Sequence, residues 1–222
     1  MSIATLILGQ SGTGKSTSLR NLNPNDVLLI QVVKKPLPFR SADWKYLSKD
    51  GGSIYVTDNP EVIIKRMQQT TKQIIIIDDY QYVMANEYMR RSTETGFNKF
   101  TEIGRKTWDV FTEASNLADE KRVYILSHTE EAESGKTKIK TIGKMLDEKI
   151  TLEGMVTICL QTGVVNEQYI FNTKNSGQNT VKSPIGLFES DHIENDLNAV
   201  DIAICDYYGI AKTETNQTTE IA

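Results

Sequence analysis

A glycine-rich stretch close to the start of the sequence, GQSGTGKST at residues 9–17, combines the residue types that bind phosphate. Its spacing fits the P-loop pattern G-x-x-x-x-G-K-[ST], with Gly9, Gly14, Lys15 and Ser16 at the fixed positions. Glycines permit a turn in which several backbone N–H groups point at one anion, and a following helix adds its N-terminal dipole. The lysine of such a loop reaches the β- and γ-phosphates of a nucleotide, and the next hydroxyl ligates Mg²⁺.

The residues on either side of this loop support the motif. Residues 3–8 are apolar and predict a buried strand, and residues 15–21 can continue as a helix. The sequence therefore predicts a site for ATP and Mg²⁺ at a strand–loop–helix unit, with Lys15 in the catalytic set. The expected nucleotide contacts come from Gly9, Gln10, Ser11, Gly12, Thr13, Gly14, Lys15, Ser16 and Thr17.

Two acidic residues follow an apolar run in KQIIIIDDYQ, residues 72–81. Four consecutive isoleucines are typical of a parallel strand that is buried on both faces. Asp78, at the end of this run, is expected to hold Mg²⁺ opposite Ser16, directly or through water. Asp79 has two open interpretations, because it could orient the attacking water or cap the helix that follows.

A second apolar run, RVYILSH at residues 122–128, also ends in polar residues. His128 is predicted to lie near the γ-phosphate and to sense it, although it could simply be a polar residue that leaves the sheet. The polar segment behind it, residues 129–143, is expected to be a flexible loop. Basic side chains that could contact DNA phosphates, or the γ-phosphate of a neighbouring subunit, are Arg90, Arg91, Lys136, Lys138, Lys140 and Lys144. The plain alternative for such charges is a solvated face.

The remaining pattern alternates short apolar runs with helical segments. Strands are predicted at residues 27–33 and 53–56. One helix is predicted to start at Pro60 with Asn59 as its N-cap, and a second, longer helix is predicted from about residue 96 to 118. This alternation predicts an α/β fold with a mostly parallel sheet flanked by helices, in which ligands bind beyond the carboxyl ends of the strands.

The last part of the chain has a different character. Residues 155–173 predict a C-terminal β-hairpin with its turn at Thr162–Gly163, and residues 192–210 predict a final helix. We therefore expect one domain over residues 1–210 and a disordered polar tail over residues 211–222.

Composition narrows the function classes. The chain has 222 residues and a formal net charge of −4, which argues against a protein that coats nucleic acid by bulk charge. Cys159 and Cys205 lie far apart and complete no metal pattern, so we expect reduced thiols. Reduced thiols in turn predict a cytoplasmic protein. No apolar run approaches the roughly 18 residues of a membrane span, which predicts no membrane partner.

Taken in order, GQSGTGKST, IIIIDD, YILSH and the lysine-bearing loop before GKMLDEKITLEGMVTICLQTG resemble the RecA-like ATPases with a minimal core. The resemblance is strongest to small ATP-binding proteins of bacteriophage replication and recombination modules, and NDLNAVDIAICDYYGI is similar to their ending. It spans most of residues 3–210. It implies a RecA-like core, a homo-oligomeric ring or filament with ATP at subunit interfaces, and a location in the host cytoplasm.

The same resemblance implies single-stranded DNA binding through the loops at about residues 80–97 and 129–143. Some phage members promote single-strand annealing beside a cognate single-stranded-DNA-binding protein. One departure matters, because such proteins often place a catalytic glutamate after the second strand and this chain has Lys34 and Lys35 there. The base is therefore Asp79, a glutamate such as Glu87 or Glu130, or absent.

Rival functions differ in how well they fit. A small-molecule kinase usually needs several arginines in a lid, but the chain has only seven arginines and none after Arg122. The N-K-x-D motif of GTPases and the L-S-G-G-Q signature of ABC-type ATPases are both missing from the sequence. A helicase loader or a nucleotide switch without DNA annealing stays open.

Overall fold

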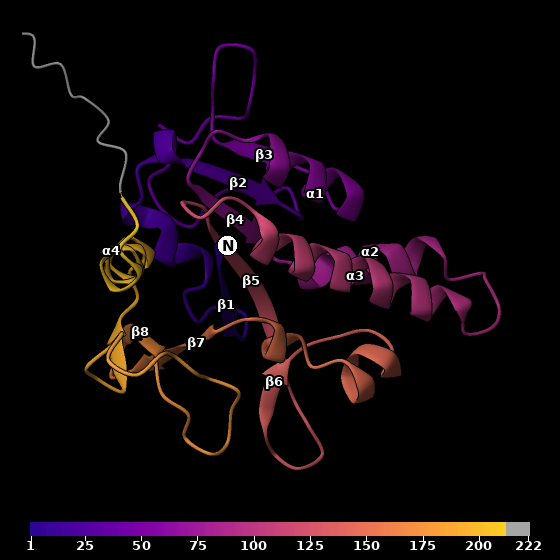
Figure 1. Ribbon diagram of the computed structural model, residues 1–222. Helices are drawn as coiled ribbons and strands as arrows, with labels where there is room; N and C mark the ends of the chain where they lie inside the picture. Colours follow the sequence, from indigo (N-terminus) through magenta and orange to yellow (C-terminus); the bar gives the residue numbers. More distant parts are fainter. Residues whose placement is uncertain (212–222) are drawn as a thin grey trace, which may run out of the picture.

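The computed structural model describes residues 1–211, apart from the side chain of Asp147. Its centre is a mostly parallel sheet in the order β3-β2-β4-β5-β1-β7-β8-β9, with β6 paired to the far end of β5 (Figure 1). The strands are β1 (Ile3–Gly9), β2 (Val27–Gln31), β3 (Ile54–Val56), β4 (Ile74–Asp78), β5 (Arg122–Glu131), β6 (Thr137–Ile139), β7 (Ile158–Val165), β8 (Gln168–Asn172) and β9 (His192–Glu194). The helices are α1 (Pro60–Gln69), α2 (Gln81–Arg90), α3 (Asn98–Asn116) and α4 (Leu197–Tyr208), with short helical turns η1 (Ser16–Asn21), η2 (Pro24–Asp26), η3 (Met145–Lys149) and η4 (Leu152–Met155).

Helices cover both faces of the sheet. The helices α1, α2 and α3 pack on one face, and α4 and η1 pack on the other (Figure 1). Successive residues of each central strand therefore enter opposite cores: Ile75 and Ile77 face α1 and α3, whereas Ile74 and Ile76 join the core with α4. This two-sided burial explains why these strands are apolar without alternation, and it confirms the predicted α/β architecture.

The strand register brings three predicted site positions to one edge of the sheet. The strands β3, β2, β4, β5, β1 and β7 run parallel. Gly9 pairs with His128, and Gln31 pairs with Asp78. The strand β5, which ends its sheet pairing at His128, lies between β1 and β4. Gly9, Asp78 and His128 therefore lie at neighbouring strand ends.

Local sequence signals set the helix ends. The Asn59 side chain accepts hydrogen bonds from the N–H groups of Glu61 and Val62 at 2.9 and 3.2 Å, and Pro60 takes the first helical position, as predicted. The helix after the phosphate loop is only the short 3₁₀ turn η1, so the helix expected over residues 15–21 is wrong in type. The final helix begins at Leu197 rather than residue 192, because His192–Glu194 pair with β8 as β9.

Three further expectations change. The segment predicted as a flexible loop, 129–143, holds the end of β5 and the paired strand β6. The turn predicted at Thr162–Gly163 is wrong, because both residues pair within β7 and β8. The chain instead reverses at Asn166 and Glu167, whose φ angles are 49° and 65°. The strand β2 ends at Gln31 rather than residue 33. Of the tail predicted over 211–222, residues 212–222 lie outside the described residues.

A buried charged cluster fastens α4 to the sheet. The guanidinium of Arg122 on β5 donates two hydrogen bonds to the carboxylate of Asp201 on α4, both at 2.9 Å. The Tyr124 hydroxyl donates a third to the same carboxylate at 2.7 Å. All three side chains are buried. A charge removed from water in this way is tolerable only while its partners are present.

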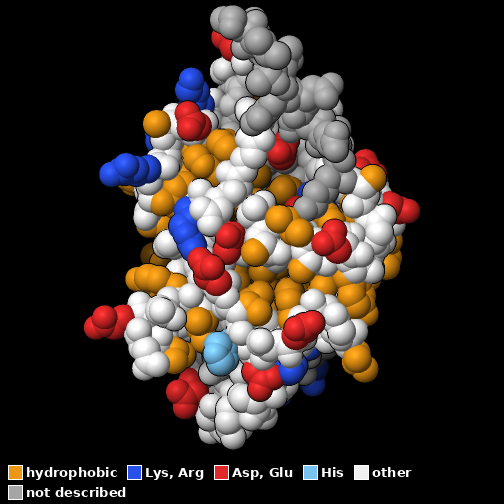
Figure 2. Space-filling model, turned by 90° about the vertical axis from the view of Figure 1, so that its left-hand side faces the viewer, with side chains coloured by type: hydrophobic (Ala, Val, Ile, Leu, Met, Phe, Trp, Pro, Cys, Tyr) orange, Lys and Arg blue, Asp and Glu red, His pale blue; other side chains and the backbone are white. Residues whose placement is uncertain are grey.

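The outer face around α4 is largely apolar. Ile185, Ile202, Tyr207 and Tyr208 are all exposed there. Figure 2 shows hydrophobic side chains gathered across the middle of this face, with charged side chains of both signs scattered around them. In the part of the chain that the structure describes, this face offers no continuous basic stripe that could follow a nucleic-acid backbone. Separately, no helix within residues 1–211 is long and apolar enough to cross a lipid bilayer.

Candidate functional site

The phosphate loop curls around its own lysine. Lys15 is only 6% exposed, and its Nζ donates to the carbonyl oxygens of Gly9 and Gln10, both at 2.8 Å. Burial lowers the pKa of Lys15 to about 8, although Asp79 and Asp78 oppose this effect. An anion in the loop would stabilise the ammonium that burial disfavours, so the site fits a phosphate group.

The predicted magnesium ligands are in contact. The Ser16 hydroxyl donates to the Asp78 carboxylate and lies 3.0 Å from each of its oxygens, although the residues are 62 positions apart. Burial, and then the charge of Asp79, raise the pKa of Asp78 to about 6. A nearby cation would offset both effects. Hydroxyl and carboxylate oxygens are hard ligands that suit Mg²⁺.

This pair cannot enclose a metal by itself. Among the described residues, no group of three or more His, Cys, Asp and Glu side chains could hold a metal ion. Mg²⁺ commonly takes one or two protein ligands and completes its shell with phosphate oxygens and waters. Ser16 and Asp78 therefore fit a magnesium ion that arrives with a nucleotide.

Asp79 is held between two basic side chains. One carboxylate oxygen binds Lys35 Nζ, and the other lies 3.5 Å from His128 Nε2. Burial alone would raise the pKa of Asp79, but the hydrogen bonds with His128 and Lys35 outweigh it and lower the pKa to about 2. The carboxylate does not cap the next helix, whose N-cap position is Tyr80. The capping interpretation of Asp79 is therefore wrong.

Lys15, Ser16, Asp79 and its two basic partners line one hollow of 430 Å³. The hollow is lined by the phosphate loop and by the side chains around Asp79. The lining residues are Ser11, Gly12, Gly14, Lys15, Ser16, Thr17, Lys35, Pro38, Asp79, Tyr82, His128 and Tyr169. A second hollow of 610 Å³ also includes Thr17 and Tyr169 and extends to Arg20, His192 and Glu194. Thr17 and Tyr169 thus lie at the junction of the two hollows.

Three residues that support the loop carry no sequence signal. Thr162 on β7 contacts Thr13, with 2.6 Å between their Oγ1 atoms. A Cβ added to Gly14 would lie 2.9 Å from Tyr169 Cδ1 and 3.1 Å from Asn195 Oδ1. The φ of Gly14 is 98°, so a side chain there would be strained as well as crowded. These contacts form only when β7, β8 and the segment before α4 fold against the loop.

We expect Gly9→Ala to destabilise the protein by about 1–3 kcal/mol, the usual cost of overpacking. A Cβ at Gly9 would lie 1.9 Å from Thr162 Oγ1 and 2.7 Å from Thr13 Oγ1. Chemical denaturation without nucleotide measures the effect. Gly154→Ala is the matched control, since its Cβ would meet Thr151 Cβ at an ordinary 3.7 Å. Adding Thr162→Ala to Gly9→Ala should restore part of the loss. Equal stability of Gly9→Ala and the wild type would contradict the crowded geometry.

The predicted basic residues on α2 are paired with acids. Arg90 binds Asp58 at 2.8 Å. Arg91 binds Glu94 at 2.7 Å and Glu102 at 2.6 Å. Neither arginine lines the hollow that contains the phosphate loop. Their charges are therefore compensated within the chain, and the structure does not bring them to Lys15.

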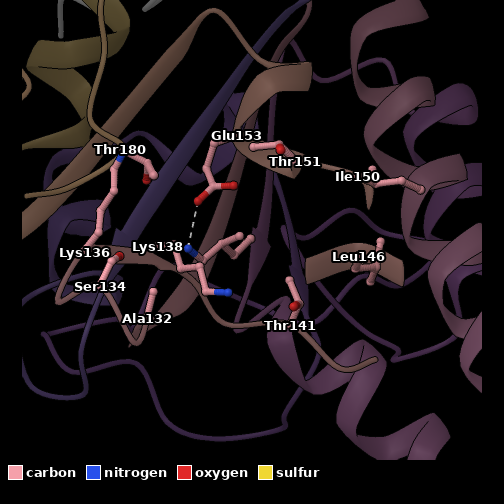
Figure 3. Close-up of a pocket in the computed structure, with 11 residues that line it drawn as sticks. Ala132, Ser134, Lys136, Lys138, Thr141, Leu146, Ile150, Thr151, Glu153 and Thr180 are labelled. Carbon is pink, nitrogen blue, oxygen red and sulfur yellow. Dashed lines mark hydrogen bonds between the residues drawn. The ribbon is translucent and has the colours of Figure 1, made fainter. Parts of the chain in front are cut away.

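The predicted lysines of the β5–β6 hairpin lie at a different place. Lys136 and Lys138 line a separate hollow of 180 Å³ (Figure 3). Glu153 lines the same hollow, and its carboxylate accepts a hydrogen bond from the Ile139 N–H at 2.9 Å (Figure 3). Lys138 also lies 3.6 Å from Glu130. These lysines are thus separate from the phosphate loop of their own chain.

The other two lysines lie at the junctions of the hairpin. The N–H of Lys140 donates to the carbonyl oxygen of His128 at 2.8 Å, so the hairpin is bonded to the residue at the strand end. Lys144 takes the N-cap position of η3. Of the four lysines, Lys140 therefore has the most direct connection to the site, through its backbone.

The two glutamates considered as bases are engaged elsewhere. Glu87 lies 3.4 Å from Arg90 and 3.7 Å from Arg91, and Glu130 faces Lys138. Neither glutamate lines the hollow with the phosphate loop. Among the residues that line this hollow, Asp79 is the acidic one, and Asp78 contacts the lining residue Ser16.

A scan against protein-family models found no family that matches this chain, and a search of curated proteins found no match either. The resemblance to RecA-like ATPases stays a prediction based on motifs. Function is therefore inferred from the residues of the site and from their geometry.

Proposed function

We propose that this chain binds Mg²⁺-ATP between the phosphate loop and Asp78, and hydrolyses it as a RecA-like ATPase that acts on single-stranded DNA. The observation that carries the nucleotide part is the contact of Ser16 with Asp78, 3.0 Å to each carboxylate oxygen, directly after the buried Lys15. A P-loop hydroxyl and a strand-end aspartate are the pair that holds Mg²⁺ in nucleoside triphosphatases of this kind.

Each residue has a physical role in this proposal. The loop N–H groups and Lys15 bind the β- and γ-phosphates, and the nucleoside extends past Thr17 and Tyr169 into the adjoining hollow. Ser16 and Asp78 hold Mg²⁺, which when bound neutralises charge on the phosphates. His128 faces the same hollow and senses the terminal phosphate.

The DNA part of the proposal is supported by continuity of the chain. The strand β5 runs without interruption from the sheet through His128 into the hairpin with β6. The Lys140 N–H bonds the His128 carbonyl, so a shift at the strand end is passed to the lysine-bearing hairpin. We place single-stranded DNA, and a neighbouring subunit of a ring or filament, on that side. A cognate single-stranded-DNA-binding protein is a further proposed partner.

One observation favours a second function, a nucleotide switch or helicase loader. Efficient proton abstraction needs a base whose pKa lies near the working pH. The pKa of Asp79 is lowered to about 2, with burial opposed by His128 and Lys35, so this carboxylate is a weak base. Glu87 and Glu130 are paired with cations elsewhere. Slow hydrolysis would suit a protein whose bound state carries the signal.

The two functions are separated by ATP hydrolysis with and without single-stranded DNA, at low and moderate salt. Stimulation by DNA that weakens with salt is the result expected of a DNA-acting ATPase, because phosphate contacts are salt-dependent. ATP binding without a DNA effect at either salt would overturn the DNA part and favour the switch. Failure to bind ATP at all would overturn the nucleotide part.

A further inference from the structure

The lysine that departs from the RecA-like pattern points into the proposed nucleotide site. Lys35 lines the same hollow as Lys15 and Ser16, and its Nζ binds the Asp79 carboxylate. The two partners differ in freedom: the Lys35 side chain is 40% exposed, whereas that of Asp79 is 5% exposed. If the pair separates, the lysine is therefore the partner that moves.

The backbone at Lys35 is fixed close to the site. Its carbonyl oxygen accepts a hydrogen bond from the buried Gln31 side chain at 3.1 Å, and Gln31 pairs with Asp78 across the sheet. The next residues are Pro36 and the buried Leu37. A lysine has a flexible four-carbon stem, so its ammonium can change partner while this backbone stays in place.

We propose that Lys35 exchanges Asp79 for the terminal phosphate of a bound nucleoside triphosphate, and thereby distinguishes triphosphate from diphosphate. This inference rests on the proposed nucleotide site. A terminal phosphate carries more negative charge than a carboxylate, so the Lys35 ammonium should form the stronger ion pair with the phosphate. Asp79 keeps a partner after the exchange, because His128 Nε2 lies 3.5 Å from its other oxygen. The exchange also frees one Asp79 oxygen in the hollow.

The test compares the binding of ADP and of a non-hydrolysable ATP analogue, each with Mg²⁺, by calorimetry. Lys35→Ala is expected to weaken binding of the ATP analogue roughly tenfold or more, the usual effect of losing a charge-assisted hydrogen bond. Binding of ADP should change less than about twofold, since ADP lacks the terminal phosphate. Lys34→Ala is the matched control, because Lys34 is exposed and lies over the Tyr46 ring, with 5.4 Å from Nζ to the centroid.

Asp79→Asn gives the reciprocal measurement. Asparagine tolerates the positive φ of 62° at this position and removes the charge that competes for Lys35. We expect the preference for the ATP analogue over ADP to rise about threefold or more. This gain should depend on Lys35. A double-mutant cycle with Lys35→Ala therefore separates the exchange from the simple loss of repulsion between the Asp79 carboxylate and the nucleotide phosphates.

The outcomes separate the two proposals. Selective loss of ATP-analogue binding in Lys35→Ala, with a gain in Asp79→Asn that vanishes in the double variant, supports the exchange. Equal effects on ADP and the analogue in Lys35→Ala, or an Asp79→Asn gain that persists without Lys35, would overturn it while the nucleotide site stands. A wild type that binds neither nucleotide would overturn both.

Discussion

Lys15→Ala is expected to reduce ATP hydrolysis at least about a hundredfold, the size of effect seen when one preorganised charge-stabilising group is removed. Its ammonium lies inside the curled loop, bonded to the carbonyl oxygens of Gly9 and Gln10. Removal of the side chain therefore deletes the charge proposed to bind the β- and γ-phosphates.

Hydrolysis and nucleotide affinity should be measured together for this variant. Lys49→Ala is the control, because Lys49 is exposed, does not line the hollow with the phosphate loop, and its substitution removes the same charge. Stability should change little in Lys15→Ala, because the loss of two hydrogen bonds is offset by removal of an ammonium that burial disfavours and whose pKa burial lowers to about 8. Unchanged ATP affinity and turnover in Lys15→Ala would remove the phosphate loop from the proposed mechanism.

Asp201→Ala is expected to lower the free energy of unfolding by about 3–5 kcal/mol, the usual cost of breaking a buried ion pair from one side. The substitution would leave the buried guanidinium of Arg122 without the carboxylate that accepts two of its hydrogen bonds. It would also leave the Tyr124 hydroxyl without its acceptor. Because these residues join α4 to β5, we expect α4 to separate from the sheet before the sheet itself unfolds.

Urea unfolding of matched variants checks this value. Asp206→Ala removes an exposed carboxylate from the same helix and should change stability by less than about 0.5 kcal/mol. Tyr124→Phe keeps the ion pair and removes one hydrogen bond, so a loss of about 1 kcal/mol is expected. If Asp201→Ala proved no more costly than Asp206→Ala, the buried cluster would not be what holds α4.

The features that sequence predicts here are those set by short-range pattern. The isoleucine run at residues 74–77 and the motif at 9–17 place two strand ends, and parallel pairing then brings Ser16 to Asp78. Capping residues fix the start of α1 in the same local way. These features can be predicted because the residues in each short pattern determine the local structure almost on their own.

Other features depend on residues that meet only in the folded chain. Thr162–Gly163 has a strong turn composition, yet packing of Thr162 against the phosphate loop keeps both residues in β7, and the turn moves to Asn166–Glu167. The contact of Lys35 with Asp79 requires β2 beside β4 and a fixed loop after β2. No sequence pattern around Lys35 or Asp79 indicates that the two residues are in contact.

The position of β1 has a consequence for how the protein is made. It lies inside the sheet, but both of its neighbours come much later in the chain: Ile3 pairs with Arg122, and Thr5 pairs with Ile158. Pairings of such long sequence separation form slowly, and during synthesis they must wait until the ribosome has released the second partner. The strand before the phosphate loop therefore leaves the ribosome well before the strands that pair with it. If nucleotide binds as proposed, it should stabilise the chain only after β5 and β7 have paired with β1.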